Sequence, residues 1–381
     1  MTADRVIAKG LAGIVVDNTA TSLVDGEAGR LYYRGYPIEQ LVEEPFAAVA
    51  HLLVFGELPT APRLAEFEAF LWQSGRLPAD QTTLLDRLAA TGAHPMAVLQ
   101  AAMPLMADGA SESGAPDEHL QQGLVIASRL PTALAHLAAG RRGAPAPAYP
   151  QTGPPTRSYC ARFLELLQGA VPSPASVRAF EQTQILQIDH SFNASTFTAR
   201  VVTSTLAPVP SALAAAMGSL YGPLHGGADQ AALEMAQSIG SAANASRYVS
   251  DCLASRRVVM GMGHREYRVV DPRARIVRRL ADELATSASD RNLIDTLKAV
   301  EEAFVAQTAA RPRTLRANLE FYKGVVYRAL GIPTEFFTAT FATARIFGWC
   351  AHIVEQRADN RIVRPSARYI GPAPRQLAIP A

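Results

Sequence analysis

The chain has 381 residues, of which 49% are hydrophobic and 18% are charged, a balance typical of a folded globular protein. Its 36 basic and 34 acidic residues leave a formal net charge of +2, which argues against a dedicated nucleic-acid surface. The chain is longer than one hydrophobic core usually serves, so we expect two domains. No membrane span or secretory signal is visible, and three widely spaced cysteines favour a reducing cytoplasm.

The first expected element is a pair of short strands or a hairpin. Residues 13–36 mix β-branched residues with the turn signal Asp25-Gly26. After residue 40 the pattern becomes helical, which predicts an all-α fold with a short N-terminal β-hairpin. Helices are expected where apolar residues recur at helical spacing: residues 45–55 before Gly56, residues 158–168 before Gly169, and residues 293–304.

Two segments are expected to be loops between helices. They run from Asp108 to Asp117 and from Gly140 to Pro155, and the second is rich in proline and glycine. No internal repeat of solenoid period is present, so a helical scaffold is not favoured. In the last third of the chain, glycine-containing breaks interrupt the helical pattern, and these breaks carry the candidate chemistry.

The first break centres on His225, which lies between Gly222-Pro223 and Gly226-Gly227. The glycines that follow allow backbone to approach a ligand closely before the next helix begins. The histidine is thereby expected at a helix N-terminus, where the macrodipole favours a neutral ring that can donate one N–H to a carbonyl. A purely structural histidine in a glycine-rich turn is the alternative.

The second break leads through a glycine-containing loop to His264. Alternating glycines expose backbone amides and carbonyls that can bind a flat heterocycle or a phosphate. The loop consists of Met260, Gly261, Met262 and Gly263. Four arginines follow and supply positive charge suited to phosphates or carboxylates, although a basic run is more often a solvated surface: Arg265, Arg268, Arg273 and Arg275.

The third break sets Glu320 among apolar and aromatic neighbours, where partial desolvation would make its carboxylate a better general base. A surface glutamate at a helix start is the alternative. Farther on, Arg345, Gly348 and His352 are predicted on one face of an apolar helix. An arginine there is costly to bury unless an anion meets it.

A polar segment and four histidines complete the candidate residues. The segment Asp189 to Thr196 fits either an internally hydrogen-bonded helix cluster or a ligand contact, and both alternatives stay open. The histidines are His190, His225, His264 and His352. They form no HxxH or HxxxH pair and have no cysteine partner, so we expect no bound metal.

Taken in order, these blocks resemble the citrate synthase family, which includes the 2-methylcitrate synthases. The blocks are His-Gly-Gly at 225–227, Gly-His-Arg at 263–265 with Asp-Pro-Arg at 271–273, Asn-x-acid-Phe-Tyr at 318–322, and Ala-Arg-x-x-Gly-Trp at 344–349. The likeness extends from residues 10–11 and 31–36 to residues 364–365 and 369–371, nearly the whole chain. Each block alone is a modest signal, but their order and spacing are highly specific.

The resemblance implies a catalytic role for three residues. His225 would hold the thioester carbonyl oxygen and stabilise the enol, and Glu320 would remove the α-proton of the acyl group. His264 would polarise the ketone of oxaloacetate and protonate it as the new carbon–carbon bond forms. The citryl-CoA thioester would then be hydrolysed, with acyl-CoA as a co-substrate and no permanently bound cofactor.

The resemblance also implies binding residues and a domain arrangement. His190, Arg273 and Arg345 match positions that bind the dicarboxylate, Arg364 matches one that reaches in from the other subunit of a homodimer, and Met260 to Gly263 match the segment that contacts the CoA adenine. Residues 1–225 and 331–381 would form a large dimer-forming helical domain. Residues 226–330 would form a smaller mobile domain that closes over the oxo acid.

Glu320 departs from the family pattern, which usually has Asp at this position. The extra methylene shifts the carboxylate by about 1 Å, and a misplacement of that size can cost about a hundredfold in rate. Glu266 and Arg268 also differ from the usual residues and are expected to tune the CoA end of the site.

Three functions remain open from the sequence. The first is a citrate synthase that uses acetyl-CoA, and the second is a 2-methylcitrate synthase that uses propionyl-CoA, or an enzyme serving both. These two differ by one methyl group, worth about 1 to 3 kcal/mol in an apolar pocket. The third is a non-catalytic helical dimer that binds CoA or an oxo acid as a sensor, which the presence of both histidines and the arginines argues against.

Overall fold

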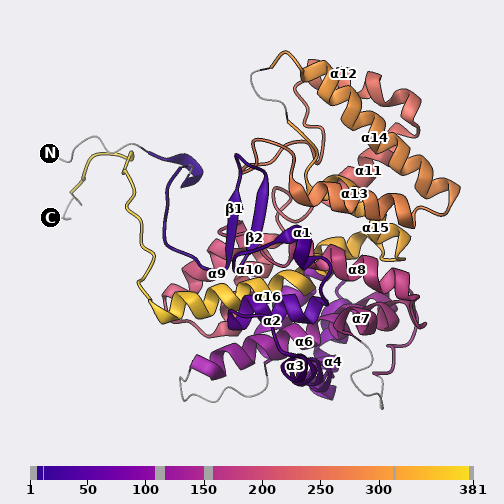
Figure 1. The fold of residues 1–381 in the computed structure, drawn as a ribbon. Helices are drawn as coiled ribbons and strands as arrows, with labels where there is room; N and C mark the ends of the chain where they lie inside the picture. The colour runs from indigo at the N-terminus through magenta and orange to yellow at the C-terminus, as the bar shows by residue number, and fades with distance from the viewer. Residues whose placement is uncertain (1–6, 12, 108–115, 150–157, 312–314, 377–381) are drawn as a thin grey trace, which may run out of the picture.

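The computed structural model describes residues 7–11, 13–107, 116–149, 158–311 and 315–376. These residues form a mostly helical protein with one small sheet near the N-terminus (Figure 1). The helices are α1 (Ile38–Leu41), α2 (Phe46–Phe55), α3 (Ala61–Gln73), α4 (Ala79–Ala89), α5 (Pro95–Ala102), α6 (Pro116–Arg141), α7 (Tyr159–Gln168), α8 (Pro174–Gln187), α9 (Ala194–Ser204), α10 (Val209–Leu220), α11 (Ala228–Ile239), α12 (Ala245–Ala254), α13 (Pro272–Leu284), α14 (Ala288–Thr308), α15 (Leu319–Ala329) and α16 (Phe337–Ala358). None of the helices in these ranges combines the length and apolarity that a membrane crossing needs.

The expected hairpin is present and is extended by a third strand. Strands β1 (Ser22–Asp25), β2 (Arg30–Tyr33) and β3 (Tyr36–Pro37) pair antiparallel in chain order. The sheet is shorter than the sequence predicts, because the described residues between 13 and 21 form no strand. At the hairpin turn, the Gly26 carbonyl accepts a hydrogen bond from the Arg268 amide at 2.8 Å, so the sheet contacts the segment that follows His264.

The predicted helix ends are confirmed at two glycines. Helix α2 stops where Gly56 takes a left-handed φ of 91° and α7 stops where Gly169 takes a φ of 72°. Both backbone amides reach back into the preceding turn, which satisfies carbonyls that a helix end would otherwise leave unpaired. The apolar stripe at residues 293–304 lies buried along α14.

The two predicted loops are only partly described. Residues 108–115 and 150–157 lie outside the described ranges. Where the structure does describe these segments, it corrects the prediction at both ends of α6. This helix begins at Pro116 and continues through Gly140 to Arg141, because the helix remains packed against α16 and α7 and tolerates a glycine in its last turn.

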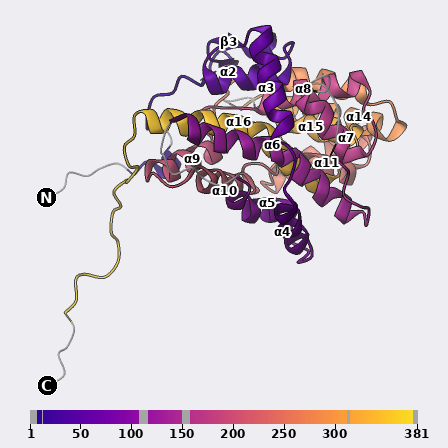
Figure 2. The ribbon, with the colours of Figure 1, turned by 90° about the horizontal axis from the view of Figure 1, so that it is seen from below.

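Helix α16 runs through the middle of the molecule and is buried along nearly its whole length. Helices α2, α6, α9 and α10 pack around it, as Figures 1 and 2 show. A second group, α11 to α14, lies together at the upper right of Figure 1, with α15 packed against both α11 and α13. After α16 the chain leaves the body as an extended segment (Figures 1 and 2). The division into a large domain and a mobile small domain at residues 226 and 330 stays a prediction.

Candidate active site

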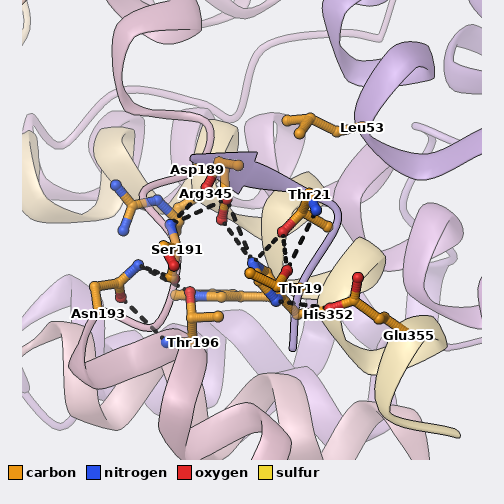
Figure 3. A network of polar contacts seen from close by, with 12 residues as sticks. Thr19, Thr21, Leu53, Asp189, Ser191, Asn193, Thr196, Arg345, His352 and Glu355 are labelled. Carbon is orange, nitrogen blue, oxygen red and sulfur yellow. Dashed lines mark hydrogen bonds and ion pairs between the residues drawn. The ribbon is translucent and has the colours of Figure 1, made fainter. Parts of the chain in front are cut away.

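The loop between α8 and α9 carries His190 and is held in place by the buried carboxylate of Asp189 (Figure 3). Ser22 Oγ donates a hydrogen bond to Asp189 Oδ2 at 2.6 Å, and Ser191 N donates to Ser22 Oγ at 2.7 Å. The His352 ring lies 3.3 Å from the same carboxylate. The polar segment from residue 189 is therefore an internally bonded loop that leads into α9, and not a cluster within one helix.

Helix α16 approaches this loop closely because residue 348 is glycine. A Cβ at Gly348 would lie 2.4 Å from the Ile188 carbonyl oxygen and 2.8 Å from Asp189 Oδ1. Both distances are too short for a carbon atom. The glycine of the Ala-Arg-x-x-Gly-Trp block is thus required by the position of the loop that presents His190.

Three aromatic rings gather beside the loop. The ring centroids of His190 and His264 are 5.1 Å apart, and those of His264 and Tyr267 are 4.7 Å apart. His190 Nε2 lies 3.2 Å from the Tyr267 hydroxyl. Burial lowers the pKa of His190 well below its usual value, and the positive charge of Arg273 lowers it further, so this ring is neutral.

The protonated nitrogen of His264 follows from its hydrogen bonds. Its Nδ1 accepts from the Glu266 amide at 3.0 Å and from the Tyr267 amide at 3.3 Å, so in a neutral ring the proton sits on Nε2. Arg273 Nη2 lies 3.4 Å from Nε2. His264 therefore presents an N–H on the side where Arg273 can hold a carboxylate.

Arg273 and the start of α15 share one anchor, Asp271. This buried carboxylate caps α13 by accepting from Arg273 N at 3.0 Å, and it also pairs with the Arg273 guanidinium at 2.8 Å. It also accepts a hydrogen bond from Leu319 N at 3.2 Å. Asp271 thus fixes an anion-binding arginine and the helix of Glu320 to each other.

Arg345 is a buried cation whose terminal nitrogens have no hydrogen-bond partner in the part of the chain that the structure describes. Its Nε donates to the Gln187 carbonyl at 2.7 Å, and its guanidinium lies 4.6 Å from the Phe341 ring centroid. Burial lowers the pKa of Arg345 to about 10. A buried guanidinium in this state is a ready site for an anion.

His225 is held by α9 and α16 and lies three residues before α11. Ser195 N donates to His225 Nε2 at 3.3 Å, Ser195 Oγ lies 2.8 Å from the same nitrogen, and Trp349 Nε1 donates to Ser195 Oγ at 3.1 Å. Because Nε2 accepts from a backbone amide, the ring proton sits on Nδ1, which has no partner among the described residues.

The ring of His225 is neutral, as the sequence led us to expect, but for a different reason. Burial is the largest cause and the positive charges of Arg345 and Lys323 add to it, together lowering the pKa of His225 to about 3. The predicted helix N-terminus is not at the histidine, since α11 begins at Ala228. Burial, with two cations from distant parts of the chain, has the effect that the sequence assigned to the helix dipole.

Glu320 stands in the first turn of α15, which Asn318 caps. Asn318 Oδ1 accepts from Glu320 N at 2.9 Å, and Asn318 also bonds the carbonyl oxygens of Gly261 and Gly263, both at 2.9 Å. The loop predicted to contact CoA, Met260 to Gly263, is therefore tied directly to the turn that carries the candidate base.

The structure brings together every candidate residue except one. The positive charge of Arg345 helps to lower the pKa of His190 and of His225. The charges of Arg273 and Glu320 in turn act on the pKa of Arg345, so all five groups lie near one another. Arg364 lies apart, exposed on the extended segment after α16, where its Nη1 donates only to the carbonyl of Pro365 at 3.3 Å.

Several residues of the site were missed in the sequence. They are Tyr267, Asp271 and Lys323. Asp271 stood in a quoted block, and a residue before proline at a helix start could have identified it as a cap. Lys323 lies three residues after Glu320 on the same helix face, a spacing that predicts contact. Asp189 and Ser195 stood in the predicted polar segment, but the sequence did not reveal the partner of Ser195, because His225 is thirty residues away.

Residues 10–366 match the family model described as "Citrate synthase, C-terminal domain". The chain belongs to the citrate synthase family. In the described ranges no three His, Cys, Asp or Glu side chains gather in a way that could hold a metal ion.

Individual citrate synthase relatives match over almost the full length. The citrate synthase of Mycolicibacterium smegmatis is 39% identical over 375 residues, covering 97% of both chains. The 2-methylcitrate synthase 2 of Corynebacterium glutamicum is also 39% identical, over 380 residues that cover 98% of this chain and 97% of the relative. Citrate synthase from Thermoplasma acidophilum, solved in ternary complex with carboxymethyl coenzyme A and oxaloacetate, is 27% identical with a TM-score of 0.89, covering 98% of both chains.

These likenesses fix the class of reaction. This member of the citrate synthase family is an acyltransferase of citrate synthase type with the all-α fold of its relatives. The acyl group is not fixed by them, because relatives named for two different products are equally similar.

Proposed function

We propose that the chain condenses acetyl-CoA with oxaloacetate and hydrolyses the resulting citryl-CoA to citrate and CoA. The observation that carries the proposal is the buried guanidinium of Arg345, which forms no ion pair with any described carboxylate and lies near two neutral histidines and Glu320. A dicarboxylate satisfies this cation and places its ketone between the groups that the reaction needs.

Oxaloacetate binding follows from the charges and donors. Arg345 and Arg273 hold the two carboxylates, since a guanidinium presents paired N–H donors to a carboxylate. His190 adds a neutral ring beside them. The N–H on Nε2 of His264 then donates to the ketone oxygen, polarises it, and gives up its proton as the bond forms.

The acyl-CoA half of the reaction needs a base and an oxyanion donor. The α-proton of a thioester is weakly acidic, so removal by Glu320 requires a hydrogen bond to the carbonyl oxygen as negative charge develops there. The Nδ1–H of His225 supplies it. The proton passes to Glu320, and the electron pair of the broken C–H bond forms the enolate, whose carbon attacks the ketone carbon. Water later cleaves the thioester. Met260 to Gly263 receive the CoA adenine.

Propionyl-CoA is the second candidate thioester. It is favoured by one observation, the 39% identity to a 2-methylcitrate synthase, which equals the identity to a citrate synthase. The same residues serve either substrate. The proposal also includes a homodimer in which Arg364 enters the partner's site, a cytoplasmic location, and no permanently bound cofactor.

The test measures thiol release from acetyl-CoA and from propionyl-CoA with oxaloacetate, in the wild type, Glu320→Ala and Glu320→Asp. We expect release by the wild type with at least one thioester and a loss of about a hundredfold or more in Glu320→Ala. The thioester with the higher kcat/KM identifies the product. A wild type that releases no thiol from either thioester sinks the proposal, and a wild type no faster than Glu320→Ala removes Glu320 from the base role.

A further inference from the structure

Lys323 is a buried cation that the reaction above does not use. It lies one turn after Glu320 in α15, and its side chain is closed off from solvent. Its Nζ lies 2.5 Å from Glu320 Oε2 and 3.3 Å from Asp229 Oδ2, and it donates a hydrogen bond to Gln187 Oε1 at 2.9 Å. A lysine is rarely buried this deeply without paired negative charge, so the two carboxylates are what stabilises Lys323 at this position.

One positive charge is shared between two carboxylates. The contacts of Lys323 with Glu320 Oε2 and Asp229 Oδ2 are ion pairs that lack hydrogen-bond geometry, whereas its bond to Gln187 is directional. Burial raises the pKa of Asp229 to about 6 against the lowering effect of Lys323, and the charge of Glu320 adds to the rise. With both carboxylates ionised, the cluster holds one negative charge in excess.

Packing prevents Lys323 from swinging away from the cluster. Its Nζ lies 4.2 Å from the Phe341 ring centroid. The next residue, Gly324, touches α11 so closely that a Cβ there would lie 2.8 Å from the Asp229 carbonyl oxygen. Helices α11 and α15 therefore hold the lysine and both carboxylates in one fixed arrangement.

The two oxygens of Glu320 differ in their surroundings. Oε2 is closed off from solvent and lies against Lys323, whereas the side chain as a whole keeps 15% of its surface exposed. The oxygen that can meet a substrate is therefore Oε1. A carboxylate held at one oxygen has a defined direction for the other.

We propose that Lys323 is a positioning residue for Glu320: it anchors Oε2, directs Oε1 at the α-proton, and thereby accommodates a base one methylene longer than the aspartate usual in the family. The inference rests on the base role proposed above. The inference adds Lys323 as the residue that allows a glutamate to act as the base at position 320.

Asp229 keeps Lys323 paired with a negative charge during proton transfer. When the C–H bond breaks, its electron pair passes into the enolate, which takes up the negative charge, and the proton passes to Glu320 Oε1, so the base becomes neutral. If Glu320 were the sole partner of Lys323, a buried cation would be left unpaired at that moment. Asp229 stays ionised and keeps Lys323 paired, so the cluster changes from one excess negative charge to none.

The main test removes Lys323 and its second carboxylate together, in the variant Asp229→Asn/Lys323→Met, so that no charge is left at position 229 and Glu320 loses only its anchor. We expect kcat for thiol release to fall about a hundredfold, as for a base misplaced by about 1 Å. KM for oxaloacetate should stay within about threefold, because Arg273 and Arg345 are untouched. The isotope effect on kcat with methyl-deuterated acetyl-CoA, or with propionyl-CoA deuterated at its α-carbon, should rise, since proton removal becomes the slow step.

Lys298→Met is the matched control. Lys298 also forms an ion pair, with Asp282, but on α14 and away from Glu320. This variant should keep the wild-type kcat and the wild-type isotope effect. Loss of kcat in both lysine variants would show a general effect of removing ion pairs and would overturn the positioning role.

A second variant tests the same idea while Asp229 and Lys323 both stay in place. In Glu320→Asp the shorter side chain draws back from Lys323, so we expect it to be slower than the wild type although aspartate is usual in the family. Adding Asp229→Asn/Lys323→Met to Glu320→Asp should then lower kcat by less than about tenfold, because the contact between residue 320 and Lys323 is already lost. Additive losses would overturn the inference.

The outcomes separate this inference from the proposed function. A wild type without thiol release overturns both. An active wild type with an inactive Glu320→Ala, but with an unchanged kcat in Asp229→Asn/Lys323→Met, overturns the role of Lys323 alone. If that double variant does not fold, Glu320→Asp decides, and a kcat equal to or above that of the wild type overturns the role of Lys323.

Discussion

Replacing Gly348 by alanine should damage the oxaloacetate site by displacing the loop that carries His190. The added Cβ would lie 2.4 Å from the Ile188 carbonyl oxygen, and ordinary contact begins near 3.4 Å. Helix and loop must therefore move about 1 Å apart, which carries His190 with the loop. A shift of that size in a positioned group costs about a hundredfold in rate, and forcing one methyl into a packed interior costs about 1 to 3 kcal/mol of stability.

The assay compares kcat/KM for oxaloacetate and the free energy of unfolding in urea for wild type, Gly348→Ala and Gly140→Ala. Gly140 is a fair control because it is helical and exposed, and a Cβ there meets nothing within 4 Å. Its replacement should leave activity unchanged and stability equal or slightly higher. A Gly348→Ala enzyme with wild-type kcat/KM for oxaloacetate would refute the reasoning.

Three further results are expected. Burial raises the pKa of Asp229 from 3.8 to about 6, so stability from its protonated form is present below about pH 4 and is lost as pH rises through 6. The Asp229→Asn variant should not lose this stability as the pH rises. In urea titrations its free energy of unfolding relative to the wild type should therefore grow by up to about 3 kcal/mol between pH 4 and pH 8. A difference that stays constant with pH would contradict the raised pKa of Asp229. In Arg345→Met, oxaloacetate should no longer raise Tm. The Tm without oxaloacetate should fall little, because the substitution removes a buried unpaired cation. A variant whose Tm still rises with oxaloacetate would argue against Arg345 as the anion site. Trp349→Phe removes the N–H that holds Ser195 and should lower kcat by roughly fivefold, about 1 kcal/mol, with oxaloacetate affinity unchanged, and an unaltered kcat would show that Ser195 needs no such support.

The parts of the fold that the sequence predicted depend on neighbours along the chain. Helix ends at Gly56 and Gly169 follow from local backbone conformation, and the hairpin follows from a turn signal between β-branched residues. The prediction was wrong at Gly140, where a glycine was taken as the start of a loop. Packing of α6 against other helices outweighs that local signal.

The parts of the site that the sequence did not predict depend on distant neighbours. His225 is neutral because it is buried, and because Arg345 and Lys323, both about a hundred residues away in sequence, lie close to it in space. The link of Asp271 to α15 is likewise made across 48 residues. Spacing rules describe one helix or one turn, and they cannot reveal which helices bring their charges together.

Helix α16 constrains how this chain can vary through its helical phase. Arg345 faces the anion site, Gly348 admits the His190 loop, and Trp349 supports Ser195, all within about one turn of a 22-residue helix. Deleting or inserting one residue before Arg345 would rotate these three by about 100° relative to the preceding part of α16. Point substitutions in α16 alter one contact at a time, but a change of length there would misalign both halves of the reaction at once. Length changes in this family member should therefore be confined to the segments outside α16.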